Sequence, residues 1–107
     1  MDQDIDYEAE VKRYDEGADP AAVAKIKKHL GIALQGKDSR LVSCSDASEL
    51  ETVRESWLKR KLALTDADAD LDAAIGAVCS TMKADHNKLR VTFYYLLAKN
   101  YDKLGDL

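Results

Sequence analysis

The residues most able to do covalent chemistry in this sequence are its two cysteines, Cys44 and Cys79. Cys44 stands in LVSCSDASEL, just before a predicted helix start. Ser45 or Asp46 is the expected cap there, and Glu49, three residues after Asp46, gives a capping-box-like pattern. The N-terminus of a helix can lower the pKa of a thiol and so activate it. Asp46 is two residues away, and a nearby carboxylate disfavours the thiolate. No C-x-x-C spacing supplies a resolving cysteine. We expect Cys44 to pack beneath the helix start, with a reactive, redox-active thiol as the alternative.

Cys79 lies at the edge of an apolar helical stripe and is predicted to be a small core residue. The stripe consists of Leu71, Ile75, Val78 and Met82, which we expect to face the core. A disulfide with Cys44 is geometrically possible. The acidic start of the chain, MDQDIDYEAE, lacks the basic and apolar segments of a secretory signal. We therefore expect a cytoplasmic protein, in which both thiols are reduced.

Carboxylates and histidines are the residues that could bind a metal. DADADLD resembles the start of a calcium loop, but an EF-hand needs glycine at its sixth position and glutamate at its twelfth. Neither the register from Asp66 nor that from Asp68 meets this requirement. His29 and His86 have no metal-binding partner three or four residues further on. We expect no metal, no cofactor and no catalytic residue.

Clustered cations could bind an acidic partner or nucleic acid. Lys25 and Lys28 stand in one predicted helix, and Lys59 and Arg60 in another. The formal net charge of −4 argues against a nucleic-acid protein, which needs a concentrated positive face. We expect solvated helix faces here, and keep nucleic-acid binding as an alternative.

Helical periodicity dominates the chain, and no segment shows a convincing strand alternation. Five helices are expected, at about residues 4–16, 19–31, 46–64, 66–82 and 87–104. No apolar run approaches the roughly 20 residues that span a bilayer. The sequence therefore predicts an all-α fold, a compact bundle of about five helices in one domain over residues 1–107. We leave open whether residues 1–18, an acidic N-terminal helix, pack on the remaining core, residues 19–107.

The predicted fifth helix is apolar on two faces. Such a helix is either central in its bundle or covered by another chain. Tyrosines combine apolar area with a hydroxyl group and suit contact surfaces. We favour a central position, and predict as the alternative an interface for a homodimer or for another protein. The candidate interface is the second strip, made of Val91, Tyr94, Tyr95 and Ala98, with Tyr101 at the flank.

Three stretches together resemble the bacterial proteins catalogued as domain of unknown function 2853: VSCSDASELETVRESWLKRKLAL, LDAAIGAVCSTM and KLRVTFYYLLAKNY. The similarity covers about residues 20–103 and leaves the N-terminal twenty residues outside. The resemblance implies a compact all-α fold and a bacterial origin. It implies no activity and transfers no site residue.

These observations favour a small cytoplasmic protein that acts by binding or self-association, without catalysis. The competing hypothesis is a thiol-dependent redox or stress-related role through Cys44. The residues do not identify a ligand or a partner.

Overall fold

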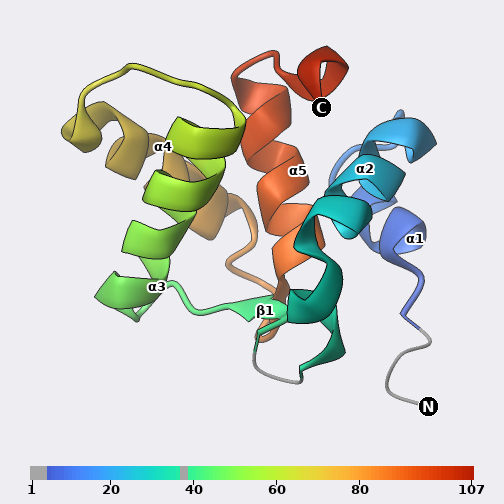
Figure 1. Cartoon of the computed structure of the whole chain (residues 1–107). Helices are drawn as coiled ribbons and strands as arrows, with labels where there is room; N and C mark the ends of the chain where they lie inside the picture. The colour runs from blue at the N-terminus through green and yellow to red at the C-terminus, as the bar shows by residue number, and fades with distance from the viewer. Residues whose placement is uncertain (1–4, 37–38) are drawn as a thin grey trace.

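The computed structural model of the chain describes residues 5–36 and 39–107. The α-helices within these residues are α1 (Tyr7–Lys12), α2 (Pro20–Leu30), α3 (Ala47–Thr52), α4 (Asp68–Thr81) and α5 (Arg90–Asn100). α5 stands in the middle, with α1 and α2 on one side and α3 and α4 on the other (Figure 1). The predicted all-α bundle of about five helices is confirmed.

A short antiparallel ribbon, which the sequence did not predict, crosses the base of the bundle. β1 (Leu41–Val42) pairs with β2 (Lys88–Leu89), with Leu41 opposite Leu89 and Val42 opposite Lys88. Two-residue strands are too short to show an alternating pattern. Because β2 uses residues 88 and 89, the fifth helix begins at Arg90 instead of the predicted residue 87.

Local signals explain where α2 begins and ends. The carboxylate of Asp19 accepts a hydrogen bond from the Ala21 backbone N–H at 2.9 Å, and Pro20 occupies the first turn. Gly31 ends the helix with a positive φ of 45°, which glycine adopts without a Cβ clash. A short 3₁₀ helix, η1 (Gly31–Gln35), follows directly.

The predicted third helix is continuous but changes geometry along its length. α3 passes at Val53 into η2 (Val53–Lys61), a π-helical segment in which backbone bonds span five residues, as from Leu62 N–H to Trp57 O at 2.9 Å. Trp57 is fully buried in this segment. It stacks on Tyr94 of α5 with 4.6 Å between ring centroids.

The acidic N-terminal helix packs on the core. Tyr7 and Val11 of α1 are buried, and α1 contacts both α2 and α5. The helix is shorter than predicted, because the chain turns after Lys12 and brings Tyr14 towards the loop after α4. A last 3₁₀ turn, η3 (Leu104–Asp106), follows α5.

Candidate functional site

The main hollow of interest lies beside the β-ribbon and has a volume of about 560 Å³. Its wall combines the ribbon, the loop before β2 and the starts of α3 and α5, and eight of its ten lining residues are polar or charged. We call it the ribbon pocket and define it by Ser39, Leu41, Val42, Ser43, Asp46, Glu49, His86, Asn87, Lys88 and Arg90.

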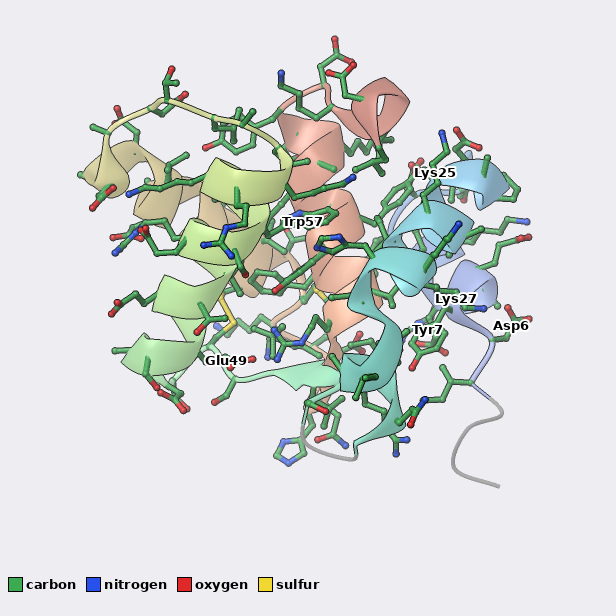
Figure 2. The ribbon with its side chains drawn as sticks, in the orientation of Figure 1. Asp6, Tyr7, Lys25, Lys27, Glu49 and Trp57 are labelled. Carbon is green, nitrogen blue, oxygen red and sulfur yellow. A yellow bond between two sulfur atoms is a disulfide. The ribbon has the colours of Figure 1, made fainter. Side chains whose placement is uncertain are left out.

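The buried guanidinium of Arg90 builds one wall of the ribbon pocket. Its Nε donates to Ser39 O at 2.6 Å, and its Nη2 donates to Leu41 O at 2.9 Å and forms an ion pair with Glu49. Its Nη1 donates to the Tyr94 hydroxyl at 3.2 Å. Glu49 points from α3 towards this inner side (Figure 2). One side chain thus joins α3, the ribbon and α5.

Asp46 forms the acidic rim of the pocket and caps α3. Its Oδ1 accepts hydrogen bonds from the Ser48 hydroxyl at 2.7 Å and from the Ser48 and Glu49 backbone N–H groups. These bonds, the one from the Ser48 hydroxyl foremost, lower the pKa of Asp46. The rim therefore carries a carboxylate at neutral pH, and the predicted cap at this helix start is confirmed.

The positive charge of the pocket comes from Lys88 of β2, which follows the exposed residues His86 and Asn87. Lys88 donates one hydrogen bond from Nζ to Asp85 O at 3.0 Å, which leaves two further donors on its ammonium group. His86 and Asn87 are exposed, and their side chains have no hydrogen-bond partner in the part of the chain that the structure describes. The pocket therefore offers both anionic and cationic groups to a ligand.

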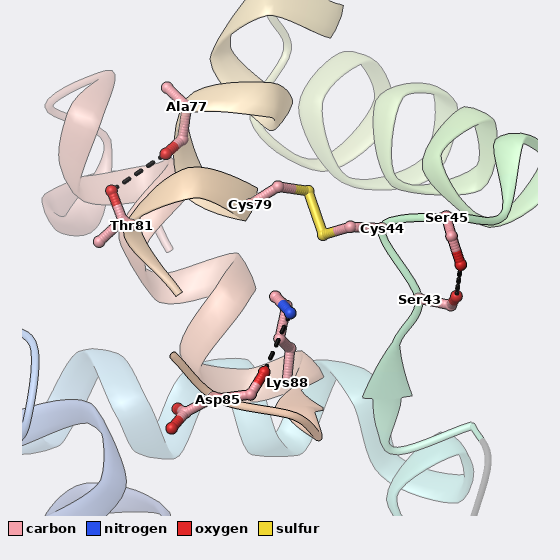
Figure 3. The surroundings of a disulfide bond; sticks show 8 residues. All are labelled: Ser43, Cys44, Ser45, Ala77, Cys79, Thr81, Asp85 and Lys88. Carbon is pink, nitrogen blue, oxygen red and sulfur yellow. Dashed lines mark hydrogen bonds between the residues drawn. A yellow bond between two sulfur atoms is a disulfide. The ribbon is translucent and has the colours of Figure 1, made fainter. Parts of the chain in front are cut away.

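The two cysteines form a disulfide next to this pocket, so the expectation of two reduced thiols is wrong for this structure (Figure 3). Cys44 lies between β1 and α3, and Cys79 lies in the last turn of α4, with 6.1 Å between their Cα atoms. Both side chains are partly buried against the core. In this state Cys44 has no free thiol, because the fold brings together two residues that are 35 positions apart.

The interface predicted on α5 is wrong. Val91, Tyr94, Tyr95 and Ala98 are all buried within the single chain, and Tyr101 is partly buried. The physical reason is that α1, α2 and α4 pack around α5, so that its second apolar strip is also core. The two-faced pattern marks a central helix.

The cations proposed as an alternative positive patch do not form one unpaired face. Lys59 lies 2.6 Å from Asp68 of α4, and Arg60 lies beside two glutamates in a separate hollow. Lys25 and Lys28 are exposed on α2, where no ion pair is present among the described residues. The structure thus divides the four cations between different surroundings.

The histidines and aspartates are likewise dispersed. Among residues 5–36 and 39–107, no three His, Cys, Asp or Glu side chains are grouped so as to hold a metal ion. The ring of His29 lies 5.3 Å from that of Trp57, and burial there, with the charge of Lys61, lowers the pKa of His29.

Among residues 5–36 and 39–107, no helix has the length and apolar character needed to cross a bilayer.

Asp85 ties the N-terminal segment to the loop after α4. It lies 2.7 Å from Arg13 Nη2 and accepts a hydrogen bond of 2.5 Å from the Tyr14 hydroxyl. These partners, Arg13 foremost, lower the pKa of Asp85, and burial together with Asp85 raises the pKa of Tyr14 to about 12.

We expect Asp85→Asn to lower the free energy of unfolding by about 1 kcal/mol at pH 7, since Arg13 is half exposed and the pair is screened. A carboxyl whose pKa is lower in the folded state stabilises the fold above its unfolded pKa, and this contribution is lost as the pH falls through the folded pKa. Urea titrations between about pH 7 and pH 2 should show the difference from wild type shrinking. Asp106→Asn, which removes a carboxylate from an exposed pair with Lys103, is the matched control. A constant difference would contradict the linkage.

Thr92 has a buried hydroxyl without a partner. It is 1% exposed, and its Oγ1 makes no hydrogen bond within the described part of the chain. We expect Thr92→Val to raise the free energy of unfolding by about 1 kcal/mol, because the substitution removes an uncompensated desolvation cost. Urea denaturation measures it, with Thr81→Val, at an exposed hydroxyl bonded to Ala77 O, as the matched control. Destabilisation by Thr92→Val would show that the hydroxyl is satisfied.

Sequence reasoning missed the two residues that build the pocket wall, Arg90 and Glu49. The available signal was a charged side chain at the start of the apolar run RVTFYYLL, where burial demands a partner. Glu49 was noticed only as part of a capping pattern. Their sequence separation of 41 hid the pairing.

A comparison with protein families finds a match over residues 6–105 to the family described as "Protein of unknown function (DUF2853)". The search of curated proteins found no match. The match begins well before residue 20, so the boundary expected from the resemblance was too late. The packing of α1 on the core gives the physical reason, because this helix is part of the folded unit.

Proposed function

We propose that this chain, which belongs to the DUF2853 family of proteins of unknown function, is a non-catalytic binding module with the ribbon pocket as its ligand site. The observation that carries the proposal is a preformed hollow, lined mainly by polar and charged residues, whose wall is held by the buried Arg90. Holding the wall in place before binding reduces the entropic cost of association.

The ligand class follows from the groups that are left available. Asp46 offers a carboxylate oxygen, Oδ2, with no hydrogen bond inside the described residues, and Lys88 offers two ammonium donors. Arg90 already occupies the carbonyls of Ser39 and Leu41, so recognition depends on side chains instead of added β-pairing. We propose a small zwitterion with an ammonium and a carboxylate group, such as a short peptide with free ends.

The proposal assigns no reaction to the pocket. The side chains of Arg90 and Glu49 are 9% and 24% exposed, and they are engaged with each other. Arg90 also donates to backbone carbonyls and to Tyr94. Groups held in this way support a wall and are poorly placed for proton transfer to a ligand.

Triglycine with free termini is a suitable first probe, titrated into ¹⁵N-labelled protein and followed by NMR. We expect shift changes confined to residues 39–49 and 86–90. Asp46→Asn keeps a capping side chain and removes the charge, and Lys88→Gln removes the cation. Each should weaken binding by roughly tenfold, the loss of one charge-assisted contact.

The controls match these changes in charge away from the pocket. Asp102→Asn is suitable because Asp102 has a φ of 57°, which asparagine tolerates, and Lys83→Gln removes an exposed cation. Both should bind triglycine like the wild type, and N-acetylated, C-amidated triglycine should not bind. Equal shifts with the blocked peptide, or none with the free one, would refute the proposal.

We also propose a bacterial and cytoplasmic setting. The resemblance supports the first, and the second is the prediction made from the sequence above. Fractionation of bacterial cells that carry the tagged gene at its own locus tests the second, with the protein expected alongside a cytoplasmic marker. Recovery with periplasmic markers would contradict this setting.

Self-association remains the second candidate, although it needs a surface other than the one predicted. Among the described large hydrophobic side chains only Ile32 is exposed, at 83%. Stable homodimers bury extensive apolar area, so we expect light scattering to give 11.9 kDa across a concentration series. A mass of twice that value would support a homodimer.

A further inference from the structure

The first turns of the third helix are held to the bundle by few contacts. None of the six described residues of α3 is buried. A hollow of about 390 Å³ separates this helix from α4, lined by Ala47, Leu50, Glu51, Arg54, Asp72 and Ile75. Burial of apolar side chains therefore contributes little to holding α3 in place.

Two other links hold α3 in place, one before and one after the start of the helix. The first is the ion pair between Glu49 and Arg90. The second is the disulfide, which fastens Cys44, three residues before α3, to Cys79 at the end of α4 (Figure 3). A further pair, Arg54 with Asp72 at 3.0 Å, lies beyond α3 in the next turn.

We propose that the Cys44–Cys79 bond is a reversible redox site that clamps α3, and that its reduction releases residues 43–52 while the rest of the bundle stays folded. The core supports this separation, because α5 packs mainly against α1, α2 and α4, whereas none of the residues of α3 is buried. Both cysteines are partly buried and neither is fully buried, so the bond is less enclosed than a disulfide inside the core would be.

The chemistry is thiol–disulfide exchange with a dithiol, either a small molecule or a protein. One thiolate of the dithiol attacks a sulfur of the Cys44–Cys79 bond and forms a mixed disulfide, and the other sulfur leaves as a thiolate. The second thiol of the reductant, as a thiolate, then attacks the reductant's own sulfur in the mixed disulfide, and the cysteine bound there leaves as a thiolate. The dithiol supplies two electrons and two protons and becomes a disulfide, and Cys44 and Cys79 become thiols. A disulfide oxidant reverses both steps.

Release of α3 would also alter the ribbon pocket, since Ser43, Asp46 and Glu49 line it. This part of the inference rests on the proposed binding function, whereas the release of α3 does not. The two parts therefore need separate measurements.

Hydrogen–deuterium exchange read by mass spectrometry tests the clamp directly. The full chain is compared after oxidation by oxidised glutathione, after reduction by dithiothreitol, and after reoxidation. We expect amides in residues 43–52 to exchange at least about tenfold faster when reduced, with α5 unchanged, and the effect to reverse on reoxidation. The Cys44→Ser/Cys79→Ser variant should exchange like the reduced chain and ignore dithiothreitol.

Several outcomes would overturn the proposal. Equal amide exchange in the oxidised and reduced chains would show that the disulfide does not hold α3 in place. Faster exchange throughout the reduced chain would show global unfolding. Failure of oxidised glutathione to form the bond would show that the site is not reversible. Titration of triglycine into both states completes the test. Unchanged binding alongside a released α3 would refute only the link to the pocket, and absence of binding in both would refute only the proposed ligand.

Discussion

Arg90→Met should lower the free energy of unfolding by about 3–5 kcal/mol, the cost of breaking a buried ion pair by removing one partner. The side chain of Arg90 is 9% exposed, and its loss leaves Glu49 without a counter-ion. It also leaves the carbonyls of Ser39 and Leu41 and the hydroxyl of Tyr94 without this donor. Urea denaturation followed by circular dichroism measures the change.

Two further variants separate charge from geometry. Arg90→Lys keeps the positive charge but loses the planar fork that reaches several acceptors, so we expect an intermediate loss. Arg90→Met combined with Glu49→Leu should recover part of the loss, because no unpaired carboxylate is then left. If Arg90→Met costs less than about 1 kcal/mol, the value typical of a surface pair, the guanidinium does not hold this wall.

Trp57→Ala should be comparably severe, with an expected loss of about 3–5 kcal/mol from the cavity that it leaves. Trp57 is fully buried, stacks on Tyr94, and donates from Nε1 to Tyr94 O at 3.1 Å. That bond also satisfies a carbonyl within α5. Thermal and urea unfolding monitored by circular dichroism are the appropriate measurements, because the substitution removes the chain's single tryptophan.

Trp57→Phe is the matched control, since it keeps an aromatic ring and removes the hydrogen bond. We expect a loss of about 1–2 kcal/mol, from the bond and part of the ring volume. Equal losses for the phenylalanine and alanine variants would assign the whole effect to the hydrogen bond. A negligible loss for alanine would contradict the packing of η2 on α5.

The two largest expected effects meet at one residue of the central helix. Tyr94 receives the ring of Trp57 on its face and the guanidinium of Arg90 at its hydroxyl. We therefore expect the Arg90→Met and Trp57→Ala losses not to add, because both change the surroundings of Tyr94. This coupling links the wall of the ribbon pocket to the core.

The sequence was sufficient for the features that depend on neighbours within a turn or two. The spacing of Leu71, Ile75, Val78 and Met82 predicted the buried face of α4, and all four are buried. Ser45 or Asp46 was predicted as the cap of the third helix, and Asp46 accepts the expected backbone bonds. Such signals act through contacts between residues four or fewer positions apart, so they can be predicted directly from a single chain.

The contacts that build the candidate site could be identified only from the tertiary structure. The disulfide joins residues 35 positions apart, and the Arg90–Glu49 pair joins residues 41 apart. No local preference favours either pairing over its alternatives, because each depends on the path of the helices between the two partners. The two-residue strands form for the same reason, as partners brought together by the bundle.

The fifth helix shows both what the sequence predicts and what it leaves to the tertiary structure. Its two apolar faces, including Tyr94 and Tyr95, were evident in the sequence, and two environments were compatible with them. Apolar area gains the same free energy whether its own bundle or another chain covers it, so periodicity alone does not say which one does. The packing of α1, α2 and α4 around α5 decided it, and with it the place where a binding site has to be sought.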